Sequence, residues 1–324
     1  MKKLLLPFAC IVLGLLSSCD PNDDASTPST PSTFEQNFGS MVSRDFIGQI
    51  VNVSNQPIGN ATVTVGDLSV QTDASGVFII NGASVHEKFA YVTAGKTGYI
   101  DGSRSLVPNI GKNSVRIMLL DGTVTQTVTS GQPSEVSISS GTKVNFDGSF
   151  EDENGAAYNG MVGVYVFHLT ASNPDIASLM PGMLYAETET GNEAVLKTFG
   201  MLNVELRGSG GQKLQIASGH TAQITMRIDD NQLATAPQSI PLWHFDADKG
   251  WWIEDGTATR QGNNYIGNVS HFSWWNCDTF ASTVNLTVTV HDARKVGLEL
   301  GGFQQVNARR GRAEHIEKLL RGGL

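Results

Sequence analysis

Short β-type runs separated by turn residues constrain the fold of this chain more than any other feature of its sequence. In the run ATVTV, Val63 and Val65 share one face and Thr62 and Thr64 the other, as expected of a half-buried strand. Gly occurs 35 times, and clusters such as TDASG supply tight turns. The run MVGVYVFHL at 161–169 is largely apolar on both faces, which predicts a central strand. Because no helical stripe of useful length appears, the sequence predicts an all-β fold.

The length of the chain indicates more than one domain. Its 324 residues exceed one small module, and the expectation for this length is two domains plus accessory segments. We expect two tandem β-sandwich-type domains behind a signal sequence and a flexible tether. In chain order, the expected segments are a signal peptide at 1–19, a disordered tether at 20–43, a first β-sandwich at 44–121, a second β-sandwich-type region at 122–280, and a strand plus basic tail at 281–324.

A secretory signal opens the chain. Lys2 and Lys3 precede the apolar run LLLPFACIVLGLL, which is too short to span a hydrocarbon layer of about 30 Å and ends at Ser17, Ser18 and Cys19. The sequence LLSSC resembles the lipobox of bacterial lipoproteins. This resemblance implies that Cys19 becomes the first mature residue and carries lipid. The alternative is an ordinary secreted protein that is cut nearby.

The residues after Cys19 bear on where the protein resides. The stretch DPNDDASTPSTPST has no apolar face to bury, which predicts an extended tether. The acidic residues Asp20, Asp23 and Asp24 resemble the export signal of some Gram-negative surface lipoproteins, so the expected location is the outer membrane, lipid-anchored and exposed at the cell surface. Under enterobacterial sorting rules, an Asp directly after the Cys indicates retention in the inner membrane instead.

Charge and cysteine content exclude several classes of protein. The formal net charge is -9, whereas nucleic-acid binding rests largely on clustered Lys and Arg, so no nucleic-acid partner is expected. Cys10 and Cys19 belong to the signal, which leaves Cys277 alone in the folded body. A lone thiol forms no intramolecular disulfide and is poor evidence for a zinc site. Stability must therefore come from packed β structure.

One stretch of the first β region carries a recognisable pattern. The sequence GQIVNVSNQPIGNATVTVGDLSVQTDASGVFIINGAS contains a Pro-x-Gly-x-Ala-x-Val-like step at 57–63, in which Asn60 stands next to the Ala. A Thr-Asp-x-x-Gly-x-Phe step follows at 72–78, and then the pair Gly98 and Tyr99. This pattern resembles the carboxypeptidase regulatory-like domain, and the resemblance implies a small transthyretin-like β-sandwich. Modules of this family accompany peptidases without performing hydrolysis.

The second β region carries a further resemblance. Its segments are, in chain order, GTKVNFDGSFEDENGAAYNGMVGVYVFHL, LMPGML, LKTFGMLNVEL and IPLWHFDADKGWWIEDGTATRQGNNYIGNVSHFSWWNCD. They are similar to an extracellular β module of bacterial surface lipoproteins, and parts resemble cartilage intermediate layer proteins. The combined order of the two regions implies a surface lipoprotein of unassigned function.

All five Trp residues fall within a short window near the end of the second region. Strand alternation puts Trp251 and Trp252 on opposite faces, and likewise Trp274 and Trp275, so each pair is predicted to supply one core ring and one outward ring. Either the rings pack a sandwich core and its corner, or the outward rings form a platform on which sugar rings stack. The second alternative makes Trp252, Trp275 and Trp243 candidate ligand-binding residues.

No catalytic or metal-binding motif stands out. The acidic groups at 246–254 and 151–154 could offer oxygen ligands to calcium, but they match no EF-hand spacing, and exposed acidic turns explain them. The seven His residues show no metalloprotease spacing, and a Gly-x-Ser-x-Gly elbow is absent. We therefore expect no enzyme activity, no cofactor and no metal site.

The C-terminal segment departs from the β pattern. VNLTVTV, at 284–290, alternates like the opening strand of another β domain, but basic residues dominate from Arg294 onward. AEHIEKLLRGGL could form only a helix too short to be stable alone. Two alternatives stay open: a truncated or frame-shifted domain, or a natural basic tail that docks on the acidic body or on a partner.

These expectations combine into one functional hypothesis with one alternative. The hypothesis is a non-enzymatic, lipid-anchored cell-surface protein with a structural, adhesive or protein-binding role. The alternative is a carbohydrate-binding accessory lipoprotein that uses exposed Trp residues. The expected partners are the membrane, through the lipid on Cys19, and an unknown surface protein or polysaccharide.

Overall fold

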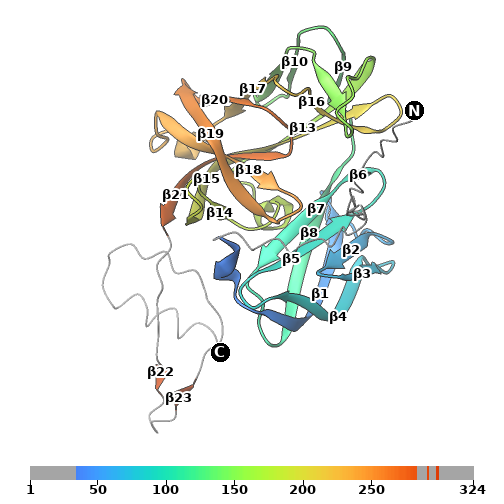
Figure 1. Ribbon diagram of the computed structural model, residues 1–324, viewed down its shortest axis with the longest axis vertical. Coiled ribbons are helices and arrows are strands. Elements are labelled where there is room, and N and C mark those ends of the chain that lie inside the picture. Colours follow the sequence, from blue (N-terminus) through green and yellow to red (C-terminus); the bar gives the residue numbers. More distant parts are fainter. Residues whose placement is uncertain (1–33, 283–289, 292–296, 299–324) are drawn as a thin grey trace, which may run out of the picture.

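The computed structural model is all-β, as the sequence predicts (Figure 1). Helical structure in the described part is limited to α1 (Ile176–Leu179) and two 3-10 turns, η1 (Glu35–Phe38) and η2 (Asp230–Gln232). Among the described residues no helix is long and apolar enough to cross a membrane. The structure describes residues 34–282, 290–291 and 297–298.

The two ends of the chain fall largely outside these ranges. The predicted signal peptide and Cys19 are not among the described residues. Of the strand predicted at 284–290, only Val290 is described, in β22 (Val290–His291), which pairs antiparallel with β23 (Gly297–Leu298).

Residues 41–121 form a first β unit of two four-stranded sheets. Its strands are β1 (Met41–Asn52), β2 (Thr62–Val65), β3 (Leu68–Gln71), β4 (Val77–His86), β5 (Ala90–Gly95), β6 (Tyr99–Ile100), β7 (Gly102–Leu106) and β8 (Lys112–Asp121). One sheet has the order β4-β1-β8-β6 and the other β3-β2-β5-β7. β1 and β8 run parallel, whereas the paired strands of the second sheet are antiparallel.

The core of the first β unit lies between these two sheets. Phe46 and Phe78 from one sheet and Val63 and Val92 from the other are each at most 2% exposed. Full burial of a side chain of this size stabilises the fold by about 1.5–3 kcal/mol. The prediction that Val63 and Val65 share a buried face is confirmed, since both are 0% exposed.

Residues 126–282 form a second β unit built on one 13-stranded sheet. Its strands are β9 (Gln126–Thr129), β10 (Ser134–Ser137), β11 (Lys143–Phe146), β12 (Phe150–Asp152), β13 (Met161–Leu169), β14 (Tyr185–Glu187), β15 (Glu193–Gly208), β16 (Lys213–Ile216), β17 (Ala222–Arg227), β18 (Ser239–Asp246), β19 (Trp251–Gln261), β20 (Asn264–Val269) and β21 (Trp274–Ser282). The main path runs β10-β11-β17-β20-β19-β18-β21-β15-β13-β9.

This long sheet curls around its own core. β9 and β10, the two ends of the path, lie together, and Gln126 Nε2 donates a hydrogen bond to the Glu135 carbonyl at 3.4 Å (Figure 1). Buried side chains from strands all along the path, such as Val136, Val164 and Trp275, form one cluster inside. β13 lies between β15 and β9, so the central strand predicted at 161–169 is confirmed.

The predicted tether at 20–43 ends earlier than expected. Phe34 and Phe38 are 0% and 3% exposed, and β1 begins at Met41, where it pairs with His86 of β4. The composition around these residues is polar, which favours a tether. Burial of the two aromatic rings, however, contributes more free energy than the chain entropy that is lost when the segment becomes ordered. The packed body therefore includes residues 34–43, which the sequence assigned to the tether.

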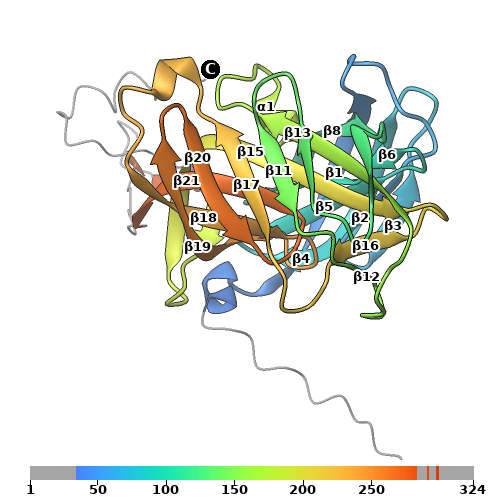
Figure 2. The same ribbon diagram turned by 90° about the horizontal axis from the view of Figure 1, so that it is seen from above.

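The two β units lie against each other (Figure 2), and side chains of both form a third apolar cluster at their junction. Val51 and Met118 from the first unit pack with Phe245 and Trp252 from the second. We call this cluster the junction core. Because buried side chains of both units belong to this one cluster, the two units form one body.

Hydrogen bonds reinforce the junction at its rim. Tyr91 Oη donates to the Ala247 carbonyl at 2.9 Å, and Ser105 Oγ donates to the Gly250 carbonyl at 2.6 Å. Gly250 has φ +88°, and a Cβ on it would lie 2.5 Å from the Tyr91 ring. Only glycine therefore allows the second unit to approach β5 and β7 this closely.

Candidate functional site

The five Trp side chains are all buried. Trp243 and Trp252 are 0% exposed, Trp275 is 1%, Trp251 is 4% and Trp274 is 7% exposed. The prediction of one outward ring in each Trp pair is therefore wrong, whereas the alternative that the rings are packed in the interior agrees with the structure. Neighbouring Trp residues do point to opposite faces, but both faces are covered.

The cover over Trp251 comes from distant parts of the chain. Its ring lies 5.2 Å from Phe34, 5.3 Å from Phe38 and 5.7 Å from Phe89, measured between ring centroids. Phe34 and Phe38 belong to the N-terminal segment and Phe89 to the first unit. On the opposite face of β19, Trp252 packs in the junction core. We call the rings of Phe34, Phe38, Phe89 and Trp251 the aromatic latch.

The polar atoms of two other Trp rings are also used internally. Trp243 Nε1 donates to the Asp278 carbonyl at 3.1 Å, and Trp275 Nε1 donates to the His271 carbonyl at 3.0 Å. Trp243 and Trp275 are thus buried and have their N–H groups bonded within the protein, so neither indole ring is accessible to a ligand. The sequence-predicted candidates Trp252, Trp275 and Trp243 therefore support the fold and do not form a sugar-stacking surface.

Two imidazoles pack beside Trp275. The ring centroids of His244 and His271 are 4.7 Å apart, and Asp255 Oδ2 lies 3.5 Å from His244 Nδ1. Burial lowers the pKa of both imidazoles, and the neighbouring His271 lowers the pKa of His244 further, while Asp255 opposes both shifts. Both rings are therefore mainly neutral at pH 7.

A second buried polar group surrounds the lone thiol of the folded body. Burial raises the pKa of Cys277 well above its usual value, and it does the same for the neighbouring carboxyl of Asp278. Asn276 Nδ2 donates to Asp278 Oδ2 at 2.6 Å, and Thr198 Oγ1 donates to Asn276 Oδ1 at 2.9 Å. Cys277 is thus a protonated core residue and offers no accessible thiolate.

The acidic clusters considered for calcium build turns. Asp246 Oδ1 accepts bonds from the backbone N–H groups of Asp248 and Lys249, both at 3.0 Å. Asp152 Oδ1 accepts in the same way from the Asn154 N–H at 2.9 Å. In the part of the chain that the structure describes, no group of three or more His, Cys, Asp or Glu side chains could hold a metal ion.

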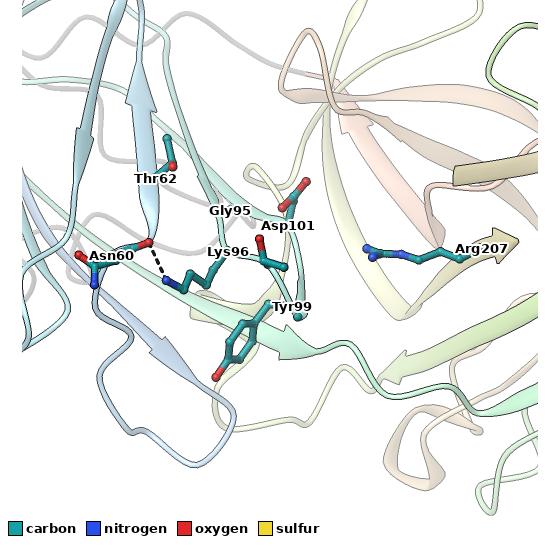
Figure 3. A pocket seen from close by; sticks show the side chains of 9 residues that line it. Asn60, Thr62, Gly95, Lys96, Tyr99, Asp101 and Arg207 are labelled. Atoms are coloured by element: carbon teal, nitrogen blue, oxygen red, sulfur yellow. Dashed lines mark hydrogen bonds between the residues drawn. The ribbon is translucent and has the colours of Figure 1, made fainter. Parts of the chain in front are cut away.

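A polar groove opens where the two β units meet (Figure 3). Its volume is about 460 Å³. We call it the junction groove. Arg207, on β15, belongs to the second unit, and the other lining residues belong to the first. Its polar and aromatic lining residues are Asn60, Thr62, Lys96, Thr97, Tyr99, Asp101 and Arg207.

A tight turn positions the first wall of the groove. β5 ends at Gly95 and β6 begins at Tyr99, whose N–H donates to the Lys96 carbonyl at 3.0 Å. Gly98 has φ +91°, a conformation that favours glycine at this turn. The ammonium of Lys96 donates to the carbonyl of Asn60 at 3.0 Å, which holds it over the groove.

The opposite wall carries a second cation. The Arg207 guanidinium lies over the Tyr165 ring, 5.6 Å from its centroid, and Arg207 Nε donates to the Glu205 carboxylate. Figure 3 shows the end of this guanidinium pointing toward Asp101. Asp101 Oδ2 lies 3.9 Å from the ammonium of Lys213. The groove thus has a cation on each wall and a carboxylate between them.

Sequence reasoning did not find this groove. In the sequence the pair Gly98 and Tyr99 belongs only to a family-like pattern, and nothing connects this pair with Arg207. The one available signal is local: the run GKTGY places a lysine between two glycines, which is typical of an exposed turn.

Comparison with known proteins gives one partial similarity. No family model matches the chain. The chain is 28% identical over 116 residues to cartilage intermediate layer protein 2 of Mus musculus, and the match covers 36% of this chain. The match spans only 10% of the length of that curated relative. This similarity agrees with the resemblance seen in the sequence, and it extends over about a third of the chain.

Proposed function

We propose that the protein is a non-enzymatic, lipid-anchored surface protein that presents a rigid β body for adhesion or for binding a protein or glycan. Two features of the sequence support the anchor, namely the lipobox-like LLSSC and the polar stretch behind Cys19. The partial similarity to a protein whose name places it in cartilage supports an extracellular setting.

The aromatic latch is the observation that carries this proposal. The chain that follows the proposed tether enters the body at Phe34, and its rings contact both β units at once through Phe89 and Trp251. The segment that leads from the proposed anchor thus packs on both units, and the two units are attached to the membrane as one body. A body that is held in this way keeps its junction groove in a fixed geometry at the cell surface.

The same proposal assigns the first β unit to the carboxypeptidase regulatory-like modules. Its two packed four-stranded sheets support this assignment. In the Thr-Asp-x-x-Gly-x-Phe step, Asp73 Oδ1 accepts bonds from the N–H groups of Ser75 and Val77, both at 2.8 Å, and Phe78 enters the core. The family pattern thus has a structural role here, a turn and a core anchor.

Lipid labelling and surface proteolysis of intact cells test the anchor. We expect the wild-type chain to incorporate radiolabelled palmitate and to be cut by added protease on intact cells. Cys19→Ala is expected to lose the label entirely, because no other residue supplies the acylated cysteine. Cys277→Ala is the matched control, and we expect it to keep the label since this thiol is buried. Label retained in Cys19→Ala, or a wild-type body protected on intact cells, would refute the proposal.

A further inference from the structure

The junction groove has a cation on each wall, and each cation has N–H donors beyond those used by its neighbours. Lys96 contacts a carbonyl, that of Asn60, which does not neutralise it. Arg207 forms an ion pair with Glu205 through its Nε, and the two terminal nitrogens of the guanidinium point into the groove (Figure 3). The Tyr165 ring below and Glu205 beside it fix the orientation of Arg207, so little entropy is lost when it binds an anion.

The size and lining of the groove limit what it can hold. Its volume of about 460 Å³ falls in the range of small-molecule sites. The carboxylate of Asp101 lies between the two cations, and the side of the groove at Lys96 adds the amide of Asn60 and the hydroxyl of Thr62 (Figure 3). These groups match the alternating donors and acceptors of sugar hydroxyls. The residues that line the groove include no aliphatic side chain larger than that of threonine, so the groove offers no pocket for an apolar side chain of a peptide.

We propose that the junction groove binds a carboxylated saccharide. The carboxylate of the sugar pairs with the fork of the Arg207 guanidinium, and the sugar hydroxyls bond to Asp101, Asn60 and Lys96. This inference rests on the proposed function, because it names the ligand class of a surface-displayed body. It retains carbohydrate binding but places it in the groove, away from the buried Trp residues.

Isothermal titration calorimetry on the full chain in detergent tests this ligand class. The probes are a trigalacturonate, the neutral galactotriose of the same length, and hexaglutamate as an acidic peptide. The wild type is expected to bind the trigalacturonate about tenfold more tightly than the galactotriose, as one hydrogen bond to a charged group is worth a factor of this size. Binding of the trigalacturonate is expected to weaken as salt is added.

Variants on the two walls separate the roles of the cations. Arg207→Gln is expected to abolish the preference for the acidic over the neutral sugar, while Arg207→Lys keeps part of it. Lys96→Gln, on the other unit, is expected to weaken binding of both sugars. Lys112→Gln is the control, because this exposed lysine opens β8 at the end of the strand away from β6, and it is expected to change nothing. Unchanged melting temperatures confirm that each variant is folded.

Three outcomes overturn the inference. The first is that the acidic sugar binds no more tightly than the neutral sugar, whether both bind equally or neither binds saturably. The second is an Arg207→Gln variant that keeps the preference for the acidic sugar, and the third is tighter binding of hexaglutamate than of the trigalacturonate. The last of these identifies the groove as a site for acidic peptides. Surface proteolysis is independent of all three, so a protein that is exposed on cells but binds no acidic sugar refutes this inference and leaves the proposed function standing.

Discussion

Replacing Trp251 by Ala is expected to lower the free energy of unfolding by about 3–5 kcal/mol, the usual cost of truncating a buried Trp. The ring is 4% exposed and contacts Phe34, Phe38 and Phe89, so its loss leaves a cavity where the N-terminal segment meets both units. It also removes the hydrogen bond from Trp251 Nε1 to Glu187 at 3.2 Å. Urea unfolding followed by circular dichroism measures the change.

A half-exposed aromatic residue provides the control for this experiment. Phe280 is 45% exposed and lies 5.5 Å from the Trp243 ring, so Phe280→Ala is expected to cost about 1 kcal/mol or less. Trp251→Phe keeps an aromatic ring in the latch and should fall between the two. If Trp251→Ala is no more destabilised than Phe280→Ala, the latch does not hold the body together.

Acidification is expected to destabilise the protein between pH 6.5 and pH 4. His168 is largely buried, and burial lowers its pKa from 6.5 to about 4, with Arg227 adding to this shift and Asp229 opposing it. His168 therefore takes up a proton near pH 6.5 in the unfolded chain but only near pH 4 in the folded chain. The stabilising contribution of neutral His168 is complete above pH 6.5 and declines by about 3 kcal/mol as the pH falls to 4.

Other buried groups add to this decline, and variants can separate them. His244 and His271 also have lowered pKa values, so they act in the same direction. His168→Gln keeps a polar contact for Thr142, which lies 3.1 Å from His168 Nδ1, but it cannot take up a proton in this range. Its unfolding free energy should fall less steeply than that of the wild type over this range.

An exposed histidine is the control for the pH series. His220 is exposed and pairs with Asp147 at 2.5 Å, so His220→Gln should retain the part of the decline that comes from His168. Parallel wild-type and His168→Gln curves between pH 6.5 and 4 would show that His168 does not carry the effect.

Local periodicity predicted the strands because alternation is a property of neighbouring residues. Val63 and Val65 identify β2, and the apolar run at 161–169 identifies β13 as a central strand, in both cases as the structure has them. The sequence also predicts the turn at Asp73, because an Asp followed by Gly three residues later is typical of a tight turn.

Long-range cover could not be predicted in this way. Alternation correctly put Trp251 and Trp252 on opposite faces, but an outward ring is exposed only if nothing packs over it. The cover for Trp251 comes from Phe34 and Phe38, in a stretch whose composition resembles a linker. Two rings were enough to order that segment because they enter a site that is already lined with aromatic side chains.

The junction groove escaped prediction for the same reason. Lys96 and Arg207 belong to different units, and their proximity follows from the docking of one unit on the other. That docking depends on apolar residues such as Val51 and Met118, which in the sequence look like any other core positions of the first unit. A single sequence carries no signal for which core residues pack within a unit and which pack across units.

Differential scanning calorimetry of the full chain tests most directly whether the two units are one body. Because the junction core and the aromatic latch contain residues of both units, they should unfold together at pH 7 in one transition whose calorimetric and van't Hoff enthalpies agree. Two resolved transitions, or a calorimetric enthalpy close to twice the van't Hoff value, would contradict a fused body. That result would also remove the fixed geometry on which the junction groove depends.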